Sequence, residues 1–134
     1  MSSELERSAV EYEFYTGLIN EYTQQLQTLN NVYTSLSLTI SSLEGLKKSK
    51  DNVEGFTSLG SGAYVKVVVQ SVTNVIIGIG AGVFVEKNID EAINILNKRL
   101  EIIKSNIEQL QKLIEELYVR IAQLERRIAE LSRR

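Results

Sequence analysis

The sequence predicts an α+β fold in which a long antiparallel intrachain coiled coil carries two central β-hairpins that pair with other subunits in a shared sheet or barrel. Two observations predict this class. Both ends of the chain carry apolar residues at alternating spacings of three and four, which is typical of coiled-coil helices. The middle carries β-branched runs punctuated by glycines, which is typical of strands and turns. Proline is absent, which permits long uninterrupted helices.

The N-terminal segment, residues 4–50, is predicted to be the first coiled-coil helix. At about 1.5 Å per residue it would run roughly 60–70 Å. The apolar seam ends at Lys47, and Ser8 is its only polar member. The seam positions are Leu5, Ser8, Tyr12, Tyr15, Ile19, Tyr22, Leu26, Leu29, Tyr33, Leu36, Ile40 and Leu43.

Residues 56–86 are predicted to form two β-hairpins. The first covers roughly residues 56–69 and turns at Ser61, and the second covers roughly residues 74–86 and turns at Ala81. Glycines flank each turn residue, because tight hairpin turns require positive φ angles. These hairpin-turn glycines are Gly60, Gly62, Gly80 and Gly82.

The glycines of the second hairpin also admit another interpretation, a phosphate-binding or dinucleotide-binding loop. That motif requires a helix that starts within the glycines. Val83-Phe84-Val85 follows instead, which favours a strand and hence a hairpin turn.

The C-terminal segment, residues 90–133, is predicted to be the second coiled-coil helix. Asn88 or Asp90 is expected to cap its N-terminus. Twelve consecutive seam positions are all Ile or Leu. They are Ile93, Leu96, Leu100, Ile103, Ile107, Leu110, Ile114, Leu117, Ile121, Leu124, Ile128 and Leu131.

Charge predicts that the two helices pair with each other in antiparallel fashion. The first 21 residues hold five acids and one base, whereas the last 15 hold five bases and two acids. An antiparallel hairpin places these opposite charges side by side. Pairing Lys47 near Asp90 then puts Tyr12 near Glu125 and Leu5 near Ser132. Both chain ends are therefore expected at one tip, far from the strands.

Composition excludes several kinds of chemistry. The 134 residues contain no cysteine and no histidine, so disulfides, zinc fingers, Cys nucleophiles and His bases are ruled out. We predict that the chain is not an enzyme and needs no cofactor, catalytic residue or metal. The net charge of −2 argues against nucleic acid as a partner. The absence of a signal peptide and of a membrane-spanning stretch predicts a cytoplasmic protein without a membrane partner.

The strands are expected to pair with other subunits, because two isolated hairpins would leave apolar, aggregation-prone edges open. The residues predicted to mediate oligomerisation are Leu59, Tyr64, Val65, Val67, Val69, Val75, Ile77, Ile79, Val83 and Val85.

Two stretches resemble a known family. Leu59-Gly60-Ser61-Gly62-Ala63-Tyr64-Val65 and residues 75–87 are similar to the two glycine-turn hairpins of archaeal prefoldin α subunits, and the acidic helix start Asp90-Glu91-Ala92 follows as it does there. The resemblance covers nearly the whole chain and implies a single prefoldin domain over residues 1–134. It implies a hexamer of two α and four β-type subunits on a β-barrel platform. It also implies an ATP-independent chaperone, a holdase, that captures unfolded proteins at coiled-coil tips and delivers them to a chaperonin.

A tip that holds unfolded chains needs apolar residues outside its own seam. The predicted client-binding residues are Val10, Phe14, Leu18, Tyr118 and Val119, together with the seam residues Leu5, Leu124, Ile128 and Leu131 if the last turns fray. Scattered surface apolar residues are also ordinary in soluble proteins. The alternative functions are a coiled-coil scaffold or spacer without client binding, and an adaptor subunit that serves one dedicated partner.

Overall fold

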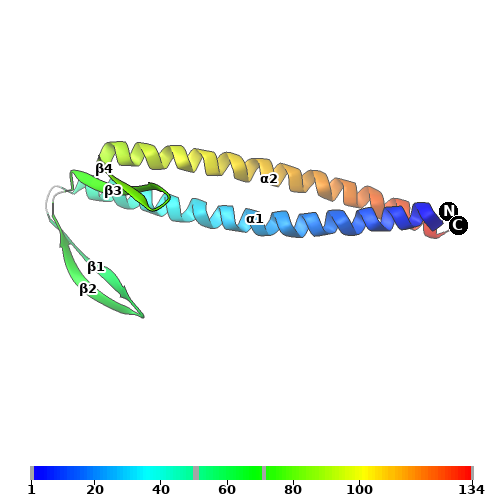
Figure 1. Cartoon of the computed structure of the whole chain (residues 1–134), viewed down its shortest axis with the longest axis horizontal. Helices are drawn as coiled ribbons and strands as arrows, with labels where there is room; N and C mark the ends of the chain where they lie inside the picture. The colour runs from blue at the N-terminus through cyan, green and yellow to red at the C-terminus, as the bar shows by residue number, and fades with distance from the viewer. Residues whose placement is uncertain (1, 50–51, 71, 134) are drawn as a thin grey trace. The chain divides into compact units, whose positions relative to one another are not determined.

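The computed structural model describes residues 2–49, 52–70 and 72–133. In chain order (Figure 1), the elements are α1 (Ser2–Lys48), β1 (Val53–Gly60), β2 (Ala63–Val69), β3 (Asn74–Gly80), β4 (Val83–Asn88) and α2 (Ile89–Ser132). The predicted α+β class, with two long helices and two antiparallel hairpins between them, is confirmed. The strands extend from Val53 to Asn88, further than the predicted 56–86. Residue 50, the predicted end of the first helix, lies outside the described residues.

The chain forms two compact units, Met1–Tyr33 with Ile102–Arg134, and Thr34–Glu101. In the first unit α1 and α2 pack along their predicted seams. Every seam position there is buried or half-buried, including the polar Ser8. The start of α1 and the end of α2 lie side by side (Figure 1), where Tyr12 donates a hydrogen bond to Glu125 at 3.3 Å. The antiparallel pairing is therefore confirmed.

The second unit has its core where α1, α2 and the β3–β4 hairpin meet. Ile40, Ile77, Ala92 and Leu96 are buried together. Leu36, Leu43, Val75, Ile93 and Leu100 pack around them. Burying one isoleucine or leucine side chain stabilises a fold by about 1.5–3 kcal/mol. The predicted helix register is also found here, because Lys47 Nζ lies 2.5 Å from Asp90 Oδ1.

Both hairpins close with the same two-residue turn. Gly60 pairs with Ala63 around Ser61 and Gly62, and Gly80 pairs with Val83 in the same way. The two turn residues have positive φ, 52° and 80° in the first hairpin and 51° and 74° in the second. Positive φ at both central residues is the signature of a type I′ turn, whose twist matches that of the strands. Each hairpin also has a register shift just before its turn.

The start of α2 shows which of the two candidate residues caps it. The Asn88 side-chain oxygen accepts a hydrogen bond from the backbone N–H of Glu91 at 2.8 Å. This satisfies one of the free N–H groups at the helix start. Asp90 instead pairs with Lys47. Asn88 is therefore the capping residue.

Candidate functional site

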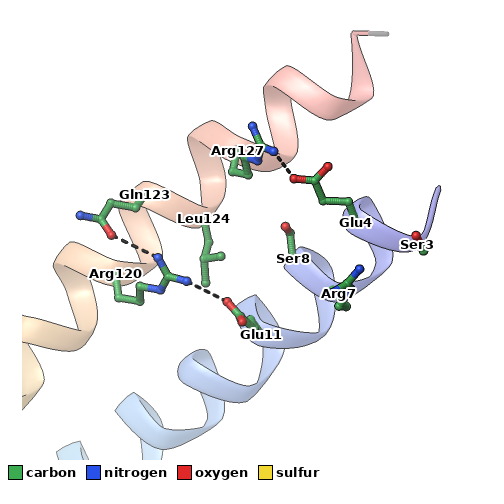
Figure 2. A pocket seen from close by; sticks show the side chains of 9 residues that line it. All are labelled: Ser3, Glu4, Arg7, Ser8, Glu11, Arg120, Gln123, Leu124 and Arg127. Atoms are coloured by element: carbon green, nitrogen blue, oxygen red, sulfur yellow. Dashed lines mark hydrogen bonds and ion pairs between the residues drawn. The ribbon is translucent and has the colours of Figure 1, made fainter. Parts of the chain in front are cut away.

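The helix ends of the first unit carry a polar cluster on one side of the seam. Figure 2 shows Glu4 and Glu11 of α1 directed toward Arg127 and Arg120 of α2. Arg120 Nη2 lies 3.0 Å from Glu11 Oε2, and its Nη1 donates to Gln123 at 3.3 Å. The open cavity here has a volume of about 620 Å³. Its lining residues are Ser3, Glu4, Arg7, Ser8, Glu11, Arg120, Gln123, Leu124 and Arg127.

The pairing with Glu4 raises the pKa of Arg127, first through their hydrogen bond and then through the Glu4 charge. Because the pKa of Arg127 is raised in the folded chain, the ion pair stabilises the fold at every pH below the ordinary arginine pKa. This stabilisation is lost only as the pH rises through the higher pKa of the folded state. Arginine is protonated at all ordinary pH values. Arg127 therefore keeps its charge throughout the physiological pH range, and the ion pair is weakened by added salt.

The predicted client-binding residues differ in exposure. Val10, Phe14, Tyr118 and Val119 are exposed to 66%, 61%, 57% and 60%. Leu18, Leu5 and Ile128 are half-buried, and Leu124 and Leu131 are buried in the seam. The four exposed residues lie at different heptad positions, c for Phe14, e for Tyr118 and f for the two valines. They are therefore distributed around the helix pair and do not form a single face.

The predicted oligomerisation residues also differ in exposure. Leu59, Tyr64, Val65, Ile79 and Val83 are exposed, whereas Val67, Val69, Val75 and Val85 are half-buried. Ile77 is 7% exposed and belongs to the chain's own core.

Sequence reasoning missed four exposed apolar strand residues, Phe56, Val68, Ile76 and Phe84. Ile76 and Phe84 alternate with Ile77 and Val85 and therefore lie on the opposite face of the β3–β4 hairpin, exposed to 72% and 66%. The sequence does show apolar residues at successive strand positions. This pattern does not indicate which face of the β3–β4 hairpin packs on the helices.

The described residues contain neither a carboxylate cluster that could hold a metal ion nor a glycine run that opens a helix. Over residues 2–49, 52–70 and 72–133, no group of three or more Asp and Glu side chains is placed to hold a metal ion. The run from Gly78 to Gly82 forms a strand end and a hairpin turn, so no helix starts within it. Neither described helix is long and apolar enough to cross a membrane.

The family model described as "Prefoldin subunit" matches residues 4–134. The chain belongs to the prefoldin family. Curated relatives named prefoldin subunit alpha include one from Pyrococcus horikoshii, 35% identical over 101 residues, which cover 75% of this chain and 68% of that protein. Another, from Methanococcus aeolicus, is 33% identical over the same shares of both chains. A third, from Thermofilum pendens, is 28% identical and matches over 75% of this chain and 78% of that protein.

A solved structure of filamentous PFD from Methanocaldococcus jannaschii shares the prefoldin fold of this chain. Its TM-score is 0.71 at 21% identity, and the match covers 84% of this chain and 93% of that one. At this identity the match supports the fold alone. Prefoldin subunits are in general chaperones without enzymatic activity, which agrees with the coiled coil and exposed apolar residues described above.

Proposed function

We propose that this chain is a subunit of an ATP-independent holdase that captures unfolded proteins near the free ends of its helix pair and delivers them to a chaperonin. The observation that carries the proposal is the exposure of Phe14, Val119, Val10 and Tyr118 beside a well-packed seam. Val10 and Phe14 lie one turn apart on α1, and Tyr118 and Val119 are adjacent on α2, so exposed apolar side chains gather towards the same end of the helix pair. Such gathering favours a surface that binds other proteins. Weak contacts of this kind suit a holdase, because several arms act together through effective concentration.

The hairpins support assembly with other subunits. In the described part of the chain each sheet contains two strands, so each strand has one edge without a partner. Exposed apolar residues such as Phe56, Ile76 and Phe84 accompany these edges. Open apolar edges favour β-pairing with another chain. We propose β-type prefoldin subunits as the partners, in a hexamer of two α and four β subunits. We also propose that this hexamer is located in the cytoplasm and needs no cofactor.

An aggregation assay tests the proposal. A chemically denatured client such as citrate synthase is diluted into buffer that contains the full chain assembled with a β-type partner, without nucleotide. The test variant is Phe14→Ser with Val119→Ser. The matched control is Leu38→Ser with Ile102→Ser, because these residues are equally exposed, at 64% and 62%, but lie elsewhere along the helices. We expect the test variant to need at least about tenfold more complex for the same suppression.

The outcomes separate the competing functions. Loss of suppression in the test variant but not in the control supports capture at the helix ends. If the wild type and the test variant suppress aggregation equally, the complex is still a chaperone, but it binds clients through a surface other than Phe14 and Val119. An assembled complex that suppresses nothing contradicts a general holdase and favours a scaffold or a dedicated adaptor.

A further inference from the structure

The two flanks of the seam in the first unit differ in charge. The flank formed by heptad positions e and b over residues 6–20 and 115–129, called the e/b face below, carries Glu6, Glu13, Glu115 and Glu125 and no lysine or arginine. The opposite flank, at positions g and c, carries the arginines that pair with Glu4 and Glu11. Arginines therefore balance the negative charge on the g/c flank, whereas no basic residue of the e/b face balances its glutamates.

Two open grooves lie along the e/b face. One has a volume of about 430 Å³ and is lined by Ala9, Tyr12, Glu13, Glu125, Ile128 and Ala129. The other, of about 400 Å³, includes Tyr118, Ile121 and Ala122, and shares Tyr12 and Glu125 with the first. Both volumes fall within the range of ligand pockets, about 300–1,000 Å³. The alanines leave space where longer side chains would cover the seam.

The carboxylates beside these grooves have no basic partner in the described part of the chain. Glu125 accepts a hydrogen bond from the neutral Tyr12 hydroxyl, and Glu13 makes no ion pair there. Both side chains are exposed and are therefore available to a partner. An apolar groove bordered by unpaired carboxylates is complementary to an apolar segment that carries positive charge.

We propose that the e/b face binds client segments in which lysine or arginine stands beside apolar residues. Apolar side chains occupy the grooves on either side of the Tyr12–Glu125 hydrogen bond, and the basic group meets Glu13 or Glu125. This inference rests on the proposed capture of unfolded chains, and it assigns the charge class of the segments that are captured.

Two fluorescein-labelled peptides of leucine, serine and glycine test it, identical except that one carries two lysines and the other two glutamates. Fluorescence anisotropy measures the Kd of each for the full chain assembled with a β-type partner. We expect the lysine peptide to bind about threefold to tenfold more tightly at low salt, with a smaller difference at high salt. Glu13→Gln with Glu125→Gln should remove the preference, since glutamine keeps the size and still accepts the Tyr12 hydrogen bond. Ala129→Lys, which adds a positive charge to the groove lined by Glu13 and Glu125, should weaken it.

The matched control is Glu21→Gln with Glu116→Gln, which removes the same charge from the opposite flank and should leave the preference intact. Equal binding of both peptides by the wild type overturns the inference, as does an equal loss of preference in the control. The aggregation assay on the same samples distinguishes the two proposals. Suppression without a charge preference overturns only this inference, whereas failure of both suppression and peptide binding overturns the proposed function as well.

Discussion

The two hairpins share their local geometry but differ in how they meet the rest of the chain. Residues 59–65 and 79–85 correspond at an offset of twenty positions, with the turns Gly60-Ser61-Gly62 and Gly80-Ala81-Gly82. Ser61 and Ala81 adopt almost the same φ, 52° and 51°. The turn sequence thus specifies the same local structure twice.

The difference lies at the positions that precede the turns. Ile77 is buried against the helices, whereas Thr57, its counterpart in the first hairpin, is exposed. Arg99 of α2 donates a hydrogen bond to the Gly78 carbonyl at 2.7 Å. No described residue of β1 or β2 is fully buried. We infer that the chain itself holds the β3–β4 hairpin, and that the β1–β2 hairpin depends on another subunit.

The largest expected effect comes from Ile77→Ala. This change leaves a cavity between Ile40, Ala92 and Leu96. Truncating a buried aliphatic residue to alanine costs about 2–5 kcal/mol. We therefore expect the free energy of unfolding to fall by about 2–4 kcal/mol, as measured by thermal or urea denaturation followed by circular dichroism at fixed subunit concentration.

Thr57→Ala is the matched control in the other hairpin, and it should change the free energy of unfolding by less than about 0.5 kcal/mol. If Thr57→Ala proved as destabilising as Ile77→Ala, the β1–β2 hairpin would be docked on its own chain too. The contrast between the hairpins would then be wrong.

An intermediate effect is expected from placing alanine at the glycine before each turn. Gly80 has φ +119° and Gly60 has φ +93°, and a new Cβ would meet no atom within 4 Å at either. The cost is therefore backbone strain, about 1–3 kcal/mol. Gly80→Ala should lower global stability because its hairpin contributes to the core. Gly60→Ala should instead increase amide hydrogen exchange within β1 and β2 only. An equal loss of global stability in both variants would contradict this assignment.

The sequence predicted the helices well, because a coiled-coil seam is a local pattern repeated many times. The predicted pairs Lys47–Asp90 and Tyr12–Glu125 both form, since one register fixes all seam contacts at once. The turns at Ser61 and Ala81 were predictable for a similar reason. Few sequences other than glycine-rich ones tolerate successive positive φ angles.

The exposed strand face was not predictable from the sequence. Ile76 and Ile77 are identical in chemistry and adjacent in the chain, yet one is exposed and the other buried. What distinguishes them is that Ile77 packs with Ile40 of α1 and with Ala92 and Leu96 of α2. Among the candidate client residues, Leu18 at position g is half-buried whereas Tyr118 at the flanking position e is exposed, a difference that the heptad register alone does not predict.

The smallest expected effect concerns the bond between Arg99 and Gly78. Opposite Gly78 in the ladder stands Phe84, whose ring lies close to the glycine, and the Arg99 guanidinium binds the Gly78 carbonyl. Arg99→Met keeps most of the aliphatic stem and removes the donor. A partly exposed hydrogen bond of this kind contributes about 1 kcal/mol, so the β3–β4 amides should exchange about fivefold faster while those of β1–β2 stay unchanged. Lys98→Met, at the neighbouring exposed position, is the control and should alter neither hairpin. Faster exchange in both hairpins of the Arg99 variant would mean that they open together, and the arginine would then stabilise the whole strand region instead of one hairpin.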